Sequence, residues 1–425
     1  MIATWRSVCS LRLILAALLL APVSYGYTVL THEAIIDSVW DASLQKLLLK
    51  RFPGATPEEL EQAHAYAYGG CIIQDLGYYP FSSRFFSDLT HYVRTGDFIS
   101  ELIRQSQDLN EYAFALGALE HYAADTEGHR IATNRAVPML YPELRRKYGK
   151  DVTYWENPVA HIRTEFGFDA LQIALGRYAP ESYKSFIGFQ VSREVLERAF
   201  LNTYGIEMKD IFGNVTLALG SYRYAVKSIV PGMTRVAWSL KQEQLKKEIP
   251  GITRKKFLYN LSRSSYEKEW GREYHQSGFG TKLLTFFFRI LPATGPFSAL
   301  QIRPPTPEVE KMFMASFNAS VDHYKAALAN IAAGSAELPN QNFDLGEPPQ
   351  LGKYPGADDA YAKLVGKLAE QKLAGMSTEL RENILGFYQG LNSHLAARAT
   401  EKEVASRVKL IEQLDRLKAI PESEQ

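Results

Sequence analysis

The stretch Tyr112-Ala-Phe-Ala-Leu-Gly-Ala-Leu-Glu-His121-Tyr-Ala-Ala-Asp125-Thr-Glu-Gly-His129 joins an apolar segment to three polar residues spaced four apart. In a helix, such positions lie roughly on one face, so His121, Asp125 and His129 share a stripe. The apolar residues before them predict that this face points into a core, where imidazole and carboxylate groups are costly unless they are paired or bind a metal. By itself, the stretch is as compatible with a hydrogen-bonded core network as with a cation site.

Helical periodicity recurs along the chain. Apolar residues at three- and four-residue spacing predict helices over residues 111–125, 157–177 and 192–201. Asn157-Pro158 is a good helix start, because Asn can cap the first turn and Pro fits within it. Alternating patterns typical of strands are scarce, and hydrophobic residues make up 46% of the chain, as in globular proteins with a substantial core. We therefore predict an all-α fold, a helical bundle built around the polar stripe.

Residues 1–26 have the pattern of a signal peptide. Two arginines precede a short apolar run over residues 13–21, and the small residues Ser24 and Gly26 then suit a cleavage site. The run is shorter than the roughly 20 residues needed to span a bilayer, so an uncleaved membrane anchor is the less favoured alternative. We expect an exported protein, periplasmic or secreted, after cleavage near Gly26.

Charge and cysteine content limit the class of protein further. The signal segment contains two Arg and no acidic residue, so its removal leaves 46 of the 48 basic residues against 47 acidic ones, a formal net charge of −1. Such a balance is not typical of a dedicated nucleic-acid binder. Cys9 leaves with the signal, and Cys71 alone cannot form an internal disulfide. The fold must depend on its core, on metal, or on both, and we expect Cys71 to be a buried apolar residue.

The rest of the chain divides by composition. Residues 241–332 are also predicted to be helical, with a less regular pattern. Their apolar run Leu283–Leu291 is too short to cross a membrane, which favours a buried helix over a membrane-touching surface. The predicted segments are a signal peptide over 1–26, a helical domain over 27–240, a helical extension over 241–332, a Pro/Gly/Asn-rich linker loop over 333–357, and a C-terminal helical segment over 358–425.

Other His, Asp and Glu residues stand where metal ligands would. His161 and Glu165 are four residues apart on the helix that begins at Asn157-Pro158, and this pair suits zinc. Asp75 and His91 each lie beside apolar and aromatic residues, where a polar group needs a partner. Taken singly, each has a simpler interpretation: a chance pair, a turn Asp, or a His satisfied in the core.

The predicted new N-terminus is a further candidate. Cleavage after Gly26 makes Tyr27 the first residue, and His32 follows five residues later. A free α-amino group and the carbonyl oxygen of the same residue can chelate a metal in a five-membered ring. Removal of the signal peptide would then also complete the metal site.

In chain order, the candidates are an N-terminus, His, Asp, His, His-x3-Asp, His and His-x3-Glu. This order resembles the ligand pattern of the trinuclear zinc phospholipases C and of the related zinc-dependent single-strand nucleases. The resemblance covers residues 27 to about 200. The phrases around Asp75, Asp88-Leu-Thr-His91-Tyr92 and Leu119-Glu-His121-Tyr122 look more like the phospholipase branch.

The resemblance implies three zinc ions and a role for each candidate residue. One zinc would be bound by Asp75, His91, His121 and Asp125, a second by Tyr27, His32 and the bridging Asp125, and a third by His129, His161 and Glu165. Asp75 would also be the catalytic general base. Three residues separate Asp125 from His129 where the family usually has five, so a two-zinc centre is the alternative. The first mature residue is Tyr where the best-known members have Trp, but chelation uses backbone atoms only.

The implied function is phospholipase C activity in lipid degradation. A zinc-activated hydroxide would cleave the phosphodiester bond of a phospholipid, giving a diacylglycerol and a phosphorylated head group, with transient membrane-surface contact and no nucleic acid as partner. One alternative is a single-strand nuclease or other phosphoesterase using the same metals, since the Tyr27–His32 spacing resembles that branch. Another is a non-catalytic protein stabilised by zinc, although ligand sets of His, His and Glu leave open positions that favour catalysis. The sequence does not indicate the oligomeric state.

Overall fold

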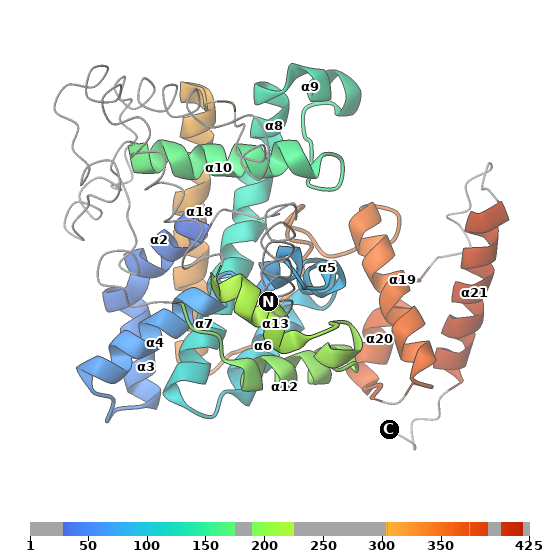
Figure 1. Ribbon diagram of the computed structural model, residues 1–425, viewed down its shortest axis with the longest axis horizontal. Helices are drawn as coiled ribbons and strands as arrows, with labels where there is room; N and C mark the ends of the chain where they lie inside the picture. Colours follow the sequence, from blue (N-terminus) through green and yellow to red (C-terminus); the bar gives the residue numbers. More distant parts are fainter. Residues whose placement is uncertain are drawn as a thin grey trace, which may run out of the picture.

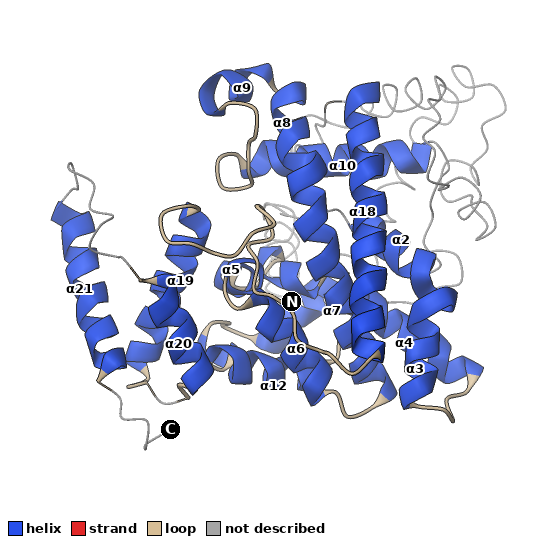
Figure 2. Ribbon diagram, turned by 180° about the vertical axis from the view of Figure 1, so that it is seen from behind, coloured by secondary structure: helices blue, strands red, loops and turns tan. Residues whose placement is uncertain are grey.

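The computed structural model of the chain describes residues 29–174, 189–224, 303, 305–373, 375–389 and 401–419. All regular elements in these residues are helices, and none is a strand (Figure 2). The predicted all-α fold is therefore confirmed. The predicted signal peptide, Tyr27 and the apolar run Leu283–Leu291 lie outside the described residues.

The chain up to residue 224 supplies the helices that carry the candidate residues. Their bounds are α2 Val29–Val39, η1 Trp40–Leu44, α3 Gln45–Arg51, α4 Pro57–Gly70, η2 Ile73–Tyr78, α5 Arg84–Tyr92, α6 Thr95–Gln105, α7 Leu109–Gly128, η3 His129–Thr133, α8 Asn134–Leu140, α9 Pro142–Tyr148, α10 Pro158–Ala174, α12 Arg193–Tyr204, η4 Met208–Asp210 and α13 Val215–Tyr224. The helices expected around 111–125, 157–177 and 192–201 correspond to α7, α10 and α12.

Helix α7 forms the centre of the bundle. It begins after Asp108, whose side chain accepts a hydrogen bond from the Glu111 N–H, and nearly all of its residues are buried. It packs against α4 on one side and α18 (Pro307–Ala332) on another (Figure 1). A Cβ atom at Gly117 would lie 2.1 Å from the Ala67 carbonyl oxygen, so only glycine permits this approach of α7 to α4. The polar stripe of α7 is thereby held inside the protein.

Helix α10 crosses the far end of α7, near α8 (Figure 1). The predicted cap is present, since the Ala160 N–H donates to Asn157 Oδ1 over 2.9 Å. Cys71, at the end of α4, is fully buried as expected. Its carbonyl oxygen faces α7, so the turn after α4 contributes directly to the interior.

The later part of the chain contributes α18 and three helices at the side of the bundle. These are α19 Pro355–Glu370, α20 Thr378–Phe387 and α21 Glu401–Lys418 (Figure 1). Helix α19 packs on α5, and α21 packs on α19 and α20. Among the described residues, no helix is both long enough and apolar enough to cross a membrane.

The segment expected to be a linker loop, residues 333–357, is irregular for most of its length but is not a free connection. Its only bridge in the described structure joins Asn342 to Glu347, and α19 begins at Pro355. Phe343 and Asp344 are buried. Around Phe343 and Asp344, this segment therefore packs into the interior of the helical body.

Candidate metal centre

Eight of the nine residues predicted to bind metal lie in the described structure, and all eight are buried at one place in the bundle. They come from six elements: His32 from α2, Asp75 from η2, His91 from α5, His121 and Asp125 from α7, His129 from η3, and His161 and Glu165 from α10. They form a first group of possible ligands, Asp75/His91/His121, a second, His32/His121/Asp125, and a third, His129/His161/Glu165. Within each group the ligand atoms lie no more than 4.8 Å apart.

The first group, together with Asp125, places four ligand atoms around one point. Nε2 of His91 lies 3.4 Å from Asp75 Oδ1, 3.4 Å from His121 Nε2 and 3.6 Å from Asp125 Oδ2. Nε2 of His121 lies 3.1 Å from Asp125 Oδ2. Ligands bonded to a tetrahedral zinc at about 2.0–2.1 Å are about 3.3 Å from one another. These spacings therefore fit one zinc ion held by the four residues.

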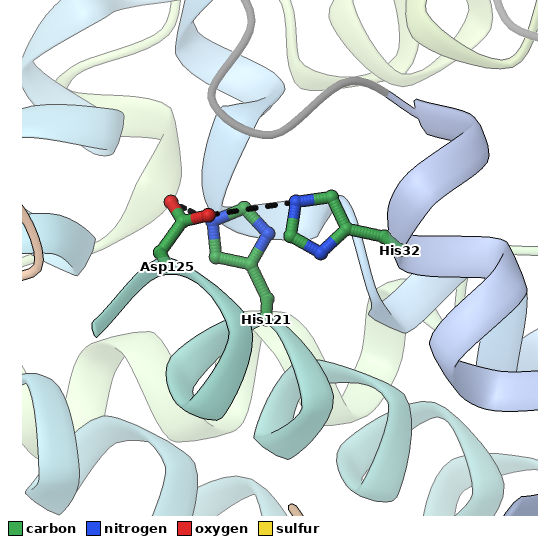
Figure 3. Close-up of side chains that lie close together, drawn as sticks. All are labelled: His32, His121 and Asp125. Carbon is green, nitrogen blue, oxygen red and sulfur yellow. Dashed lines mark ion pairs between the residues drawn. The ribbon is translucent and has the colours of Figure 1, made fainter. Parts of the chain in front are cut away.

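The second group uses the other oxygen of Asp125. His32 Nε2 lies 3.5 Å from Asp125 Oδ1 (Figure 3). The imidazole rings of His32 and His121 are stacked with centroids 4.5 Å apart, although His32 comes from α2 and His121 from α7. Asp125 thus directs one oxygen toward each group, as expected for a bridging carboxylate. Tyr27, the remaining residue predicted for this site, lies outside the described residues, and α2 begins two residues after it.

The third group lies beside the first. His129 Nε2 is 3.4 Å and His161 Nδ1 is 3.1 Å from Glu165 Oε1. His129 Nε2 is also 3.8 Å from Asp125 Oδ2, so Asp125 adjoins all three groups. The three-residue gap between Asp125 and His129 keeps both side chains on one face, because the helical path runs unbroken from α7 into the π-helical turn η3. The short gap therefore does not remove His129 from the centre.

In each of the five histidines, the ring nitrogen that faces away from the ligand groups is hydrogen-bonded to an acceptor. We call this the outer nitrogen and the other the inner nitrogen. The Nδ1–H of His91 donates to the Ser87 carbonyl over 2.8 Å, and that of His121 donates to the Cys71 carbonyl over 2.9 Å. A neutral imidazole that donates from Nδ1 has a lone pair at Nε2. Once both rings are neutral, their Nε2 lone pairs, 3.4 Å apart, face one position where a cation would be bound by both.

Side chains orient the other three rings. His32 Nδ1 lies 3.0 Å from Glu120 Oε2, and His129 Nδ1 lies 2.7 Å from Asp344 Oδ1. For His161 the partner is Oδ1 of Asn134, 3.1 Å from Nε2. Carboxylate or carbonyl partners of this kind fix the tautomer and orientation of histidines that bind metal. None of these three partners was predicted from the sequence. Glu120 could have been suspected from its position next to His121, whereas no local pattern marks Asp344 or Asn134.

The buried carboxylate oxygens of the site show whether a cation would fit there. Both oxygens of Asp125 and both of Glu165 are buried and accept no hydrogen bond from the parts of the chain that the structure describes. Burial raises the pKa of the Glu165 carboxyl well above its ordinary value, with His129 acting in the opposite direction. Buried carboxylate oxygens surrounded by imidazole nitrogens are costly unless positive charge is present. A divalent cation would satisfy them.

The pKa values of the histidines follow from the same environment. Burial lowers the pKa of His161 to about 3, and the charge of His129 acts in the same direction. For His91, burial also lowers the pKa, but interactions with Asp125 and Asp75 outweigh it and raise the value to about 10. For His129, burial is similarly outweighed, chiefly by Asp125 and Asp344, and the pKa is about 9. The carboxylates thus stabilise positive charge here, and metal binding would release protons.

His64 is a buried histidine that lies away from the candidate ligands and has a different set of contacts. It lies outside the three groups, 3.0 Å from Asp37 Oδ1, and its ring stacks on Trp40 with centroids 3.7 Å apart. It is a packed core histidine. The comparison supports the metal interpretation for the other five, whose inner nitrogens converge.

Comparison with known proteins agrees with the geometry. Residues 31–214 match the family model described as zinc dependent phospholipase C, and this range includes all eight described candidate ligands. No curated protein and no solved structure gave a match. Zinc dependence follows from the family, and the three ligand groups fit it. Residues 31–214 of this chain, which carry the described candidate ligands, are therefore similar to the zinc-dependent phospholipase C family.

Proposed function

We propose that this protein hydrolyses the phosphodiester bond of phospholipids on the diacylglycerol side, with three zinc ions. The observation that carries the proposal is the position of Asp125. Its Oδ2 lies among the ligand atoms of Asp75, His91 and His121, while its Oδ1 faces His32. A carboxylate shared in this way supports a pair of close metal ions, the arrangement used for phosphoester hydrolysis. When bound, zinc supplies Lewis acidity toward phosphate oxygens and lowers the pKa of water.

The residues of the chain would then orient the reaction. Asp75 contributes Oδ1 to the first group, and we propose that its carboxylate also takes the proton of the attacking water. The water oxygen bonds to phosphorus as the bond from phosphorus to the glycerol oxygen breaks. The proton finally passes to that oxygen. The products are a diacylglycerol and a phosphorylated head group.

The third group supports catalysis over a purely structural role. Only three side chains, His129, His161 and Glu165, make up this group among the described residues. Structural zinc sites are usually closed by four protein ligands, whereas catalytic sites keep a position open. We propose that this position faces the phosphate and the leaving oxygen.

Aromatic side chains beside the centre suggest how a lipid would reach it. The Tyr78 ring lies 6.1 Å from the His91 ring, the Tyr154 ring lies 5.8 Å from the His161 ring, and the two tyrosine rings are 5.7 Å apart. Trp155, next in sequence to Tyr154, is 42% exposed, and Phe81, three residues after Tyr78, is 41% exposed. Exposed aromatic groups near a site favour contact with an apolar surface. We propose transient contact with a membrane surface, made by an exported protein.

The experiment is a parallel assay of the mature chain. Purified protein beginning at Tyr27 is incubated with zinc and either phosphatidylcholine vesicles or single-stranded DNA, and diacylglycerol and nucleotides are measured. The expected result is diacylglycerol release that a chelator abolishes, with no nucleotide release. Nucleotide release alone would identify the nuclease reaction instead. Full metal occupancy without either product would leave only a structural role for zinc.

A further inference from the structure

A loop from the C-terminal half packs against the metal centre. We use "the 338–347 loop" for the segment from Leu338 to Glu347. Within it, the Phe343 N–H donates to the His91 carbonyl over 3.1 Å, and its buried ring lies 5.3 Å from the His91 ring and 6.0 Å from the His121 ring. The loop thus contacts residues of the first ligand group directly.

The start of α6 holds this loop in place. Thr95 Oγ1 donates to the Gln341 carbonyl over 2.8 Å and accepts from the Gln341 N–H, also over 2.8 Å. The Asp97 N–H donates to Oδ1 of Asn340 over 3.0 Å. A Cβ atom at Gly96 would lie 2.3 Å from the Leu338 carbonyl oxygen, so the close approach requires glycine. The position of the loop is therefore defined by contacts outside the metal centre.

Asp344 joins the loop to the third ligand group at two points. Its Oδ1 accepts from His129 Nδ1 over 2.7 Å, and its backbone carbonyl accepts from Asn134 Nδ2 over 2.7 Å. Because Nδ2 of Asn134 is used in this way, its Oδ1 faces Nε2 of His161 at 3.1 Å. The other oxygen of Asp344 accepts from the hydroxyls of Tyr92 and Tyr354. One buried residue thus orients two of the three predicted ligands.

We propose that Asp344 is the positioning residue of the third zinc site. It holds His129 directly and His161 through Asn134, so that the inner nitrogens of both rings face Glu165. The proposal rests on the zinc centre of the proposed function. It also gives the C-terminal half a role, because Asp344 lies outside the residues 31–214 that match the family. The metal centre is then completed by a part of this chain that lies outside the family match.

The experiment measures zinc affinity rather than activity. Asp344→Asn keeps the shape of the side chain and removes its charge. The mature variant is titrated with zinc against a chromophoric chelator, and bound metal is counted by elemental analysis. Loss of an outer partner typically weakens metal binding by about 10–100-fold. We expect a loss of that size for one zinc of three, and a changed cobalt absorption spectrum for that site alone. Glu111→Gln is the control. Glu111 is also buried, but it lies in the first turn of α7, away from the metal centre, and pairs with Arg198 of α12.

A second variant covers the case in which Asp344→Asn does not fold. Asn134→Ala removes the link to His161 and should weaken the same zinc. If wild-type protein binds three zinc ions and the folded variants bind them with unchanged affinity, the proposed role of Asp344 is refuted but the zinc centre is not. Wild-type protein with only two zinc ions, and no further loss of zinc in His129→Ala, would refute the third site and with it this proposal.

Discussion

Nε2 of His32 lies 3.5 Å from Oδ1 of Asp125, although the two residues belong to different helices, α2 and α7. The contact brings the start of the described chain to the centre of the bundle. It also leaves Oδ2 of the same carboxylate beside His121 and His91. Asp125 is therefore shared between the first and second ligand groups.

The first prediction concerns metal content. Three ligand groups around one carboxylate predict about three zinc ions per chain after dialysis, as measured by elemental analysis. A value of two would mean that one group does not bind, and the His129→Ala variant would then show whether it is the third. A value of one or none would contradict the trinuclear centre.

The second prediction concerns the bridging carboxylate. Asp125→Asn replaces a carboxylate oxygen by an amide nitrogen, which is a poor ligand, at a point shared by two groups. Both sites should lose metal, and hydrolysis should fall by more than about 100-fold, beyond the loss expected for an outer partner. Asp108→Asn makes the same chemical change at the first residue before α7, where Asn caps a helix as well as Asp does. Near-normal turnover and metal content in Asp125→Asn would show that Asp125 does not bridge two metal ions.

The third prediction concerns the partner of His32. Glu120 is fully buried, and burial raises the pKa of its carboxyl well above the ordinary value, with Asp125 acting in the same direction. Glu120→Gln should weaken zinc at the second group by about 10–100-fold while leaving the third group unchanged. Competition with a chelator measures both. Equal affinity in variant and wild type would mean that the Glu120–His32 contact does not orient the ligand.

The fourth prediction concerns stability without metal. Zinc binds the folded centre, and the ligand groups come together only in the folded chain. Free zinc at about 100 times its dissociation constant should therefore stabilise the protein by about 2.7 kcal/mol per site. Calorimetry with zinc and with a chelator should show a clear fall in Tm on chelation. An unchanged Tm would indicate that the buried carboxylates do not need a cation.

The fifth prediction concerns the N-terminus. Protein that starts at Tyr27 is compared with protein that retains Met-Gly before it. The extra residues turn the amine into an amide, whose lone pair is delocalised into the carbonyl and binds metal poorly. The extended form should fold, lose one zinc and lose most of its activity. Equal zinc content and activity in the two forms would show that the terminal amine is not a ligand.

Local patterns in the sequence predicted the helices and marked the candidate ligands, and the resemblance in residue order then assigned those ligands to zinc. The four-residue spacing of His121, Asp125 and His129 places them on one face of a helix whatever the rest of the chain does, because helix geometry is local. The same holds for His161 and Glu165 on the helix capped by Asn157. An apolar setting for these groups already predicted that they needed a partner.

Only the tertiary structure decided which partners hydrogen-bond to these ligands and orient them. The contact of His32 with Glu120 spans 88 positions in sequence, and that of His129 with Asp344 spans 215. Such pairs have no spacing rule, because they depend on how helices and loops pack rather than on the period of any one helix. The same reason applies to the 338–347 loop, whose Pro, Gly and Asn content predicts an irregular backbone but not where it lies. The sequence alone thus determined which groups could bind metal, and the packing of distant segments determined how those groups are oriented toward it.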